Sequence, residues 1–299
     1  MGIKVLFSVI LLVAAILGGG IWLRGELTKP GAPAELVGME IPPKIVVDKA
    51  PKAPAPPPAA IEPAAAPTPP PAPKKPVRIA IVIDDAGIDA KRTRRAIALP
   101  GPLTIAFLVY GNDIISQTQA AKAAGHELLV HVNMEAESRA VDPGPNVLLR
   151  NVEPDTNLKR LNWMLARFKG YVGINNHMGS KFTSDAESMT LILTEIKRRK
   201  LLFLDSRTSP KTVAGKIARS LGIRTAARDI FLDNEPELEA VLRNLARTEA
   251  IARRTGAAIA IGHPRDATLD ALAAWLPAAA ARGVRLVPIS ALVSGKAQE

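Results

Sequence analysis

The sequence predicts an α/β fold, a distorted (β/α) barrel of seven or eight mostly parallel strands, preceded by a transmembrane helix and a disordered linker. From residue 77 onward, short apolar runs alternate with helical patterns, which is typical of a parallel sheet with crossover helices. Seven or eight such units in about 220 residues favour a closed or nearly closed barrel over an open sheet. The glycine fingerprint of a dinucleotide-binding open sheet is absent from the sequence.

Residues 1–28 are predicted to form a signal anchor or transmembrane segment. Residues 5–23 carry no charge, and these 19 residues approach the ~20 that span the hydrocarbon core of a bilayer. This stretch is longer than the apolar part of a cleavable signal peptide, and Trp22 near its end suits a membrane interface. We expect an inner-membrane anchor with the following domain in the periplasm. Secretion after signal cleavage is the alternative.

Residues 29–76 are predicted to be a linker rich in proline and alanine. The stretch 30–76 holds 16 of the 26 prolines of the chain. Such a composition cannot build a core, so we expect an extended spacer rich in polyproline II structure. A spacer of this kind would hold the third segment, residues 77–299, away from a membrane.

The alternation from residue 77 onward divides the chain into strands and helices of ordinary length. Apolar runs predict strands at residues 77–83, 103–109, 127–132, 171–174, 200–204, 224–227, 230–232, 257–261 and 284–289. Helical patterns predict helices at residues 89–98, 113–124, 155–168, 184–199, 210–221, 235–254 and 266–282. The expected N-caps are Asp113, Asp155 and Ser184. The expected helix ends are Gly125, Gly222 and Gly256.

Polar residues fall at the carboxyl ends of these strands, which meet on one face of a (β/α) barrel. The set comprises Asp84, Asp85, His131, Asn133, Glu135, Asn175, Asn176, His177, Asp205, Ser206, Arg228, Asp229, Asp233 and His263. Any one of them suits a turn or a helix cap, and Asp233 in particular looks like an ordinary helix start. What indicates a site is the coincidence of paired aspartates with three of the four histidines. The fourth, His126, opens a strand and is expected to be structural.

The adjacent carboxylates of Asp84 and Asp85 at the end of a buried strand repel each other, so a metal, a proton or cationic side chains should neutralise them. Because the chain has no cysteine, a metal would be held by His, Asp or Glu. Asp and His suit Zn²⁺ or another divalent ion that keeps one position open for water. One carboxylate can bind the ion while its neighbour acts as a base, and a histidine opposite can protonate a leaving group. This layout is typical of a hydrolase for an amide or an ester.

The net charge of +11 suggests a nucleic-acid partner, but the charges are scattered and aromatic residues make up only 4% of the chain. Without aromatic side chains there is no platform on which bases stack, so we expect no nucleic-acid partner. Attraction to anionic lipid or to a cell-wall polymer explains the charge equally well. The sequence also lacks the Gly-x-Ser-x-Gly, P-loop and His-Glu-x-x-His motifs.

Short motifs at the strand ends carry a resemblance to a known family. The motifs are Ile-Asp-Asp (83–85), Gly-His-Glu (125–127), His-x-x-Met-Glu (131–135), Asn-Asn-His-Met-Gly-Ser (175–180), Leu-Asp-Ser (204–206) and Gly-His-Pro (262–264). Together they resemble the divergent polysaccharide deacetylase family over roughly residues 77–293. The resemblance implies a distorted seven-stranded barrel similar to that of carbohydrate esterases. It also implies the metal-dependent removal of acetyl groups from N-acetyl sugars.

Carried over by position, the resemblance implies a role for each of several residues. Asp84 resembles the catalytic base and Asp85 a metal ligand. His131 resembles the first ligand histidine of the superfamily, and His263 resembles the general acid on a late strand. The arginine-proline motif that usually holds the base is not recognisable in this sequence.

The chain departs from the superfamily four residues after His131, where Glu135 stands in place of a second histidine. His177, which arrives from the next strand, is the natural replacement ligand. Glu135 is then expected to bind substrate, together with Asn176 and Asp205.

The resemblance and the residues together predict a metal-dependent hydrolase, with zinc as the expected metal, that removes acetyl groups from an N-acetylated envelope glycan. The expected partners are a polysaccharide or peptidoglycan-type glycan, and the membrane through the N-terminal helix. The alternative is a non-catalytic module that binds glycans or organises the envelope on a deacetylase scaffold.

Overall fold

The computed structural model describes residues 77–293. The predicted anchor at residues 1–28 and the linker at 29–76 lie outside this range. None of the helices within residues 77–293 combines the length and the apolar character needed to cross a bilayer. The strands are β1 (Val77–Ala86), β2 (Thr104–Leu108), β3 (Glu127–Met134), β4 (Gly173–Met178), β5 (Leu202–Asp205), β6 (Thr225–Ala227), β7 (Ile230–Phe231), β8 (Ala257–Gly262) and β9 (Val284–Leu286).

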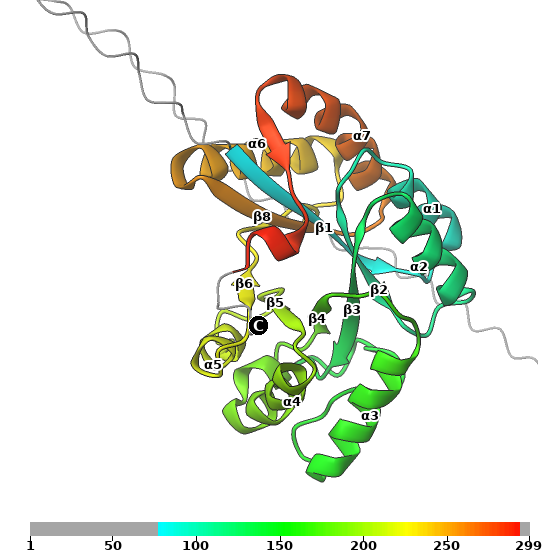
Figure 1. The fold of residues 1–299 in the computed structure, drawn as a ribbon, viewed down its shortest axis with the longest axis vertical. Coiled ribbons are helices and arrows are strands. Elements are labelled where there is room, and N and C mark those ends of the chain that lie inside the picture. Colours follow the sequence, from blue (N-terminus) through cyan, green and yellow to red (C-terminus); the bar gives the residue numbers. More distant parts are fainter. Residues whose placement is uncertain (1–76, 294–299) are drawn as a thin grey trace, which may run out of the picture. The chain divides into compact units, whose positions relative to one another are not determined.

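Seven α-helices of the described part lie on the outer side of the curled sheet (Figure 1). They are α1 (Ala90–Ile97), α2 (Ile114–Ala123), α3 (Pro154–Ala166), α4 (Ala186–Arg198), α5 (Ala214–Ser220), α6 (Leu238–Thr255) and α7 (Asp266–Ala281). Two 3₁₀ helices, η1 (Phe182–Ser184) and η2 (Ile289–Ala291), complete the order. The alternation of apolar runs with helical patterns thus predicted the order of elements correctly.

The strands pair in parallel in the order β6-β5-β4-β3-β2-β1-β8-β7, and β9 pairs with the first residues of β1. Of the predicted distorted barrel of seven or eight mostly parallel strands, the curled parallel sheet is confirmed, but the ladder of hydrogen bonds stops between β6 and β7. Only Arg228 and Asp229 separate these two strands. The Arg228 N–H donates to the Asp205 carbonyl at β5, while the Asp229 N–H donates to the Ile259 carbonyl of β8. We call this pair of residues the seam, because the chain itself joins the two edges of the sheet there.

The period of two along each strand divides the buried side chains into an outer and an inner layer. On β1, Ile79 and Ile81 pack outward with residues of α6 and α7. Ala80 and Val82 belong to the inner layer, where Leu129 of β3 also lies. On the inner side, apolar side chains fill the first part of each of these strands. A site can therefore form only at inner positions nearer the carboxyl ends of the strands.

Some helix ends differ from the prediction. The α3 helix begins with Glu153 at the N-cap and Pro154 after it, so Asp155 is not the cap. The α4 helix is capped by Asp185, which accepts a hydrogen bond from the Ser188 N–H, and not by Ser184. Asp113 does hold the N-cap position of α2, but its side chain makes no capping bond.

Three glycines do end helices or the turns after them, with positive φ angles at Gly125, Gly222 and Gly256. His126 is structural, as expected, because its Nδ1 accepts a hydrogen bond from the Leu103 N–H.

The C-terminal segment of the described part covers the inner layer at the amino ends of the strands. Ile289 is fully buried there, and its N–H donates to Oγ1 of Thr104 over 3.0 Å. We expect Thr104→Val to lower the free energy of unfolding by about 1–3 kcal/mol, since it leaves a buried N–H without an acceptor. Urea unfolding of the purified protein measures this difference.

Thr118→Val is the matched control for Thr104→Val. Thr118 is also buried, but its hydroxyl only donates to the Ile114 and Ile115 carbonyls within α2. We expect a loss below about 0.5 kcal/mol there, because no N–H loses its acceptor. Equal losses in the two variants would contradict the role assigned to Thr104.

Candidate metal centre

Toward the carboxyl ends of the strands, the side chains on the inner side change from apolar to polar. On β1, Asp84 follows Ala80 and Val82 on the inner side, and it is 3% exposed. On β3, His131 follows Leu129 in the same way and is 2% exposed. Because neighbouring strands are in parallel register, these continuations meet at one edge of the sheet. The site therefore follows directly from the inward alternation of the strands.

Adjacent residues on a strand point to opposite faces, yet Asp84 and Asp85 both reach the site. The register between β1 and β2 shifts between Ile83 and Ala86, which marks an irregularity where the two aspartates lie. Asp85 has a φ of 55°, in the left-handed region that residues other than glycine rarely adopt. This backbone turns the Asp85 carboxylate toward the same edge as Asp84.

Three nitrogen and oxygen atoms form a compact donor set at this edge. Oδ1 of Asp85 lies 2.9 Å from Nδ1 of His177 and 3.2 Å from Nε2 of His131. Within residues 77–293, this buried oxygen nevertheless has no hydrogen bond of acceptable geometry. One atom from each of the three residues lies within 4.8 Å of the others. One carboxylate and two imidazoles that share such a space fit a divalent cation.

Asn175 on β4 fixes the orientation of two of these groups, although it was expected only as one of the polar strand-end residues, with no role of its own. Its Oδ1 lies 2.8 Å from Nδ1 of His131, so Nδ1 carries a proton and Nε2 is the nitrogen that can bind a cation once it has lost its own proton. Its Nδ2 donates to Oδ1 of Asp84 over 2.8 Å and to Oγ of Ser206 over 3.1 Å. The signal was in the alternation, because Asn175 and His177 share the inner side of β4.

The charged groups at this edge shift one another's pKa values. Burial raises the pKa of Asp84, although His131 and His263 act against the rise. Burial also acts to raise the pKa of Asp85, but His131 and His177 outweigh it and hold that pKa well below its usual range. For His131, burial favours the neutral ring, yet the carboxylates of Asp84 and Asp85 raise its pKa to about 9. The carboxylates of Asp84 and Asp85 therefore stabilise a positive charge, on a histidine or on a bound cation, at the donor set.

His263 follows β8 and is held by Asp233, a residue expected to be only a helix start. That expectation was wrong. Asp233 is fully buried, and its Oδ1 lies 3.0 Å from Nδ1 of His263. Its Oδ2 accepts hydrogen bonds of 2.8 Å from the His263 N–H and from the Thr268 hydroxyl. Nε2 of His263 lies 3.7 Å from Oδ2 of Asp85, so the ring faces the donor set.

The structure places the three expected substrate-binding residues outside the donor set. Asn176 is 1% exposed, and its side chain bonds the Met178 carbonyl, Thr208 and the Ser206 N–H. Asp205 is 2% exposed and accepts hydrogen bonds from the Arg207 N–H and the Thr212 hydroxyl. Asn176 and Asp205 occupy the outward positions of their strands, so their side chains stabilise the segments that follow β4 and β5. Their contact with substrate, like that of Glu135, stays a prediction.

The fold and this edge define a parallel α/β protein with a candidate metal centre at the carboxyl ends of its strands. The chain belongs to the divergent polysaccharide deacetylase family, which matches residues 81–293. This confirms the family that the strand-end motifs resemble.

Two relatives share about a third of their aligned residues with the chain. An uncharacterized protein of Haemophilus influenzae is 37% identical over 199 residues, which are 67% of this chain and 71% of that protein. The uncharacterized protein YibQ of Escherichia coli is 34% identical over 196 residues, which are 65% of this chain and 61% of YibQ. The match thus leaves more than a third of YibQ uncovered.

Solved structures show the same fold. A crystal structure of an uncharacterized protein from Agrobacterium tumefaciens has a TM-score of 0.71 and 32% identity, covering 75% of this chain and 92% of that one. A protein described as a putative cellobiose-phosphate cleavage protein from Enterococcus faecalis has a TM-score of 0.53 and 14% identity, covering 73% and 99%. At this low identity, the second similarity concerns the fold alone.

Proposed function

We propose that the protein is a metal-dependent hydrolase that removes acetyl groups from an N-acetylated envelope glycan. The observation that carries the proposal is the donor set of Asp85, His131 and His177 beside two separately held groups, Asp84 and His263. Membership of the divergent polysaccharide deacetylase family supports the reaction class. The envelope location stays a prediction, because the segment on which it rests lies outside residues 77–293.

The donor set suits zinc, which accepts nitrogen and oxygen ligands and leaves a position open in catalytic sites. When bound, such an ion supplies Lewis acidity, which polarises a carbonyl group and lowers the pKa of water. Asp85, His131 and His177 would hold it, since their donor atoms converge and Oδ1 of Asp85 lacks a hydrogen bond in the described part.

Asp84 is the group suited to accept a proton. Its raised pKa brings the carboxyl closer to the operating pH, where a general base exchanges protons most effectively. The Asn175 amide binds Oδ1 of Asp84, which leaves Oδ2 directed toward His131 at 3.6 Å from Nε2. Asp84 would take the proton of the attacking water as the acetamide carbonyl is attacked.

His263 is the group suited to give a proton to the leaving amine. Burial favours its neutral ring, but the bond to Asp233 and the carboxylates of Asp85 and Asp84 raise its pKa. The ring is therefore protonated more readily than an ordinary histidine. Since Asp233 binds Nδ1, the proton that faces the site is the one on Nε2.

Acetate release and metal content test the proposal together. We expect the purified protein, loaded with Zn²⁺, to bind about one equivalent and to release acetate from N-acetylated glucosamine oligomers. Removal of the metal with a chelator should abolish release, and renewed Zn²⁺ should restore it. A protein that stays metal-free in excess Zn²⁺ would remove the basis of the proposal. A protein that binds metal and glycan but releases no acetate would favour the non-catalytic alternative.

Metal affinity is expected to depend on pH. In the metal-free protein, His131 has a pKa of about 9 and is protonated at neutral pH, so a cation must displace a proton from the site. Affinity should therefore rise about tenfold per pH unit between about pH 7 and 8.5, and the rise should end above the pKa. Competition against a chromophoric chelator measures this slope. An affinity that does not change over this range would contradict the expected proton release.

A further inference from the structure

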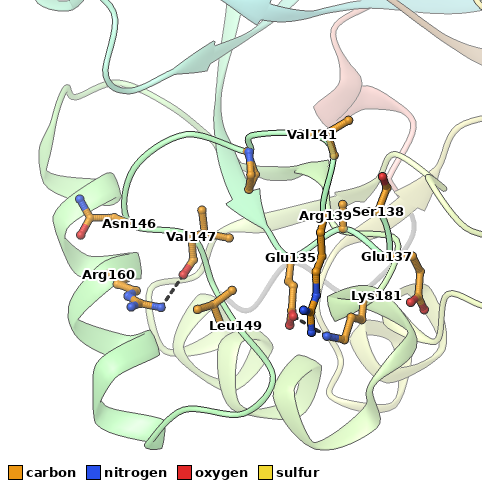
Figure 2. A pocket seen from close by; sticks show the side chains of 12 residues that line it. Glu135, Glu137, Ser138, Arg139, Val141, Asn146, Val147, Leu149, Arg160 and Lys181 are labelled. Carbon is orange, nitrogen blue, oxygen red and sulfur yellow. Dashed lines mark hydrogen bonds and ion pairs between the residues drawn. The ribbon is translucent and has the colours of Figure 1, made fainter.

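A cavity of about 510 Å³ is lined in part by residues that follow β3 and β4, and it takes no part in the chemistry described so far. Figure 2 shows its lining, which comes from the segment after β3, from α3 and from the segment after β4. Val141, Pro143, Val147 and Leu149 supply apolar surface, and charged side chains surround them. We call this cavity the side pocket.

Two guanidinium groups in the side pocket have unused hydrogen-bond donors. Arg160 donates to the Val147 carbonyl through Nη1, and its other N–H groups make no bond within residues 77–293. Arg139 has no hydrogen-bond or ion-pair partner in the same described range. Figure 2 shows Arg160 on one side of Val147 and Leu149 and Arg139 on the other. The side pocket therefore offers two guanidinium groups with free N–H donors next to an apolar surface.

Of the two carboxylates that line the side pocket, one is paired with cationic or N–H groups and the other is free. Glu135 is neutralised, because Lys181 pairs with its Oε1 and the Arg150 N–H donates to its Oε2. Glu137 also lines the pocket, and its carboxylate has no partner within residues 77–293. With Lys181 and Glu135 paired, two arginines face one free carboxylate, so the net charge available to a ligand is positive.

The side pocket is joined to the candidate metal centre through β3. Leu148 pairs with Met134 at the end of that strand, and Nδ2 of Asn133 donates to the Pro145 carbonyl over 2.8 Å. His131 lies four residues before Glu135, which corresponds to about 13 Å along an extended strand. A short oligosaccharide covers this distance, so one glycan chain can reach both places.

We propose that the side pocket binds a carboxylate-bearing branch of the glycan, with an apolar stem, while an acetamido group of the same glycan lies at the candidate metal centre. The inference rests on the proposed function, narrows the expected glycan to one with short acidic branches and assigns the side pocket as the place that binds such a branch. Arginine suits this ligand because its planar fork binds a carboxylate through two parallel hydrogen bonds. The apolar surface of the side pocket would contact the apolar part of the branch that carries the carboxylate. The free carboxylate of Glu137 would repel the carboxylate of the ligand and weaken its binding.

Calorimetric binding to the metal-loaded full chain tests this assignment with two matched probes. One is an N-acetylated disaccharide that carries a lactyl-peptide branch with a free carboxylate. The other is the same compound with that carboxylate amidated. We expect the acid to bind about tenfold or more tighter than the amide. Arg139→Gln should remove most of this preference, whereas Glu137→Gln should increase it.

Arg94→Gln is the matched control, since Arg94 is an exposed arginine of α1 that does not line the side pocket. It should leave the preference unchanged. Equal binding of the acid and the amide, or equal effects of the substitutions at Arg139 and Arg94, would overturn the inference. Absence of acetate release from either probe bears only on the proposed function, because the preference in binding is measured without turnover.

Discussion

Asp84→Asn is expected to lower kcat for acetate release by about a thousandfold, since general base catalysis contributes about 10²–10⁴ to a rate. The substitution keeps the shape of the side chain, and the new amide oxygen can still accept the bond from Asn175. The donor set of Asp85, His131 and His177 also remains. Metal content should therefore stay at about one equivalent while turnover is lost, and metal analysis with an acetate assay measures both.

Asp89→Asn is the matched control for this prediction. Asp89 lies five residues further along the chain and caps α1 by accepting bonds from the Lys91 and Arg92 N–H groups. Asparagine caps helices about as well as aspartate, so activity and stability should both stay near those of the parent. Turnover within a few fold of the parent in Asp84→Asn would show that another group accepts the proton.

Asp233→Asn is expected to lower kcat by about a hundredfold or more, because Asp233 orients His263 and stabilises its protonated form. The amide oxygen can keep the bonds from the His263 N–H and from Thr268. The amide nitrogen then faces Nδ1 of His263, which must act as an acceptor. The imidazolium loses its partner, and the pKa of His263 falls.

The pH profile separates this positioning role from a purely structural one. Activity that depends on protonated His263 is lost as the pH rises through its pKa, so the alkaline limb should move to lower pH in Asp233→Asn. Thr268→Val is the control, since it removes one donor to Oδ2 of Asp233 and leaves the contact with Nδ1. That variant should keep the parent profile. An unmoved alkaline limb in Asp233→Asn would argue against the proposed acid.

Much of the fold was predictable because apolar alternation is a local property of the sequence. The strands differ from their predicted ranges mainly at the ends, where turns such as that at Lys200, with a φ of 58°, decide where the strand begins. The site was predictable to the same degree. Asp85, His131 and His177 lie together because parallel strand ends converge, which the order of elements already implies.

The parts that were missed depend on side chains that meet across long distances in the chain. Asn176 was chosen over Asn175, although alternation with His177 places Asn175 on the inner side of β4. Asp233 was assigned to a helix start because its neighbours resemble one, while its actual partner lies 30 residues later at His263. Likewise, nothing local in the sequence reveals the left-handed conformation of Asp85.

At the seam of Arg228 and Asp229, the covalent chain and hydrogen bonds to β5 and β8 join the edges of the sheet, and no ladder of strand hydrogen bonds does. Everywhere else in the described sheet, neighbouring strands are held by hydrogen-bonded ladders. The three residues of the donor set all lie on the uninterrupted arc of β1 to β4. A local shift of the chain at the seam would therefore leave the spacing of the donor atoms unchanged. The geometry of the candidate metal centre thus does not depend on how the sheet is closed at the seam.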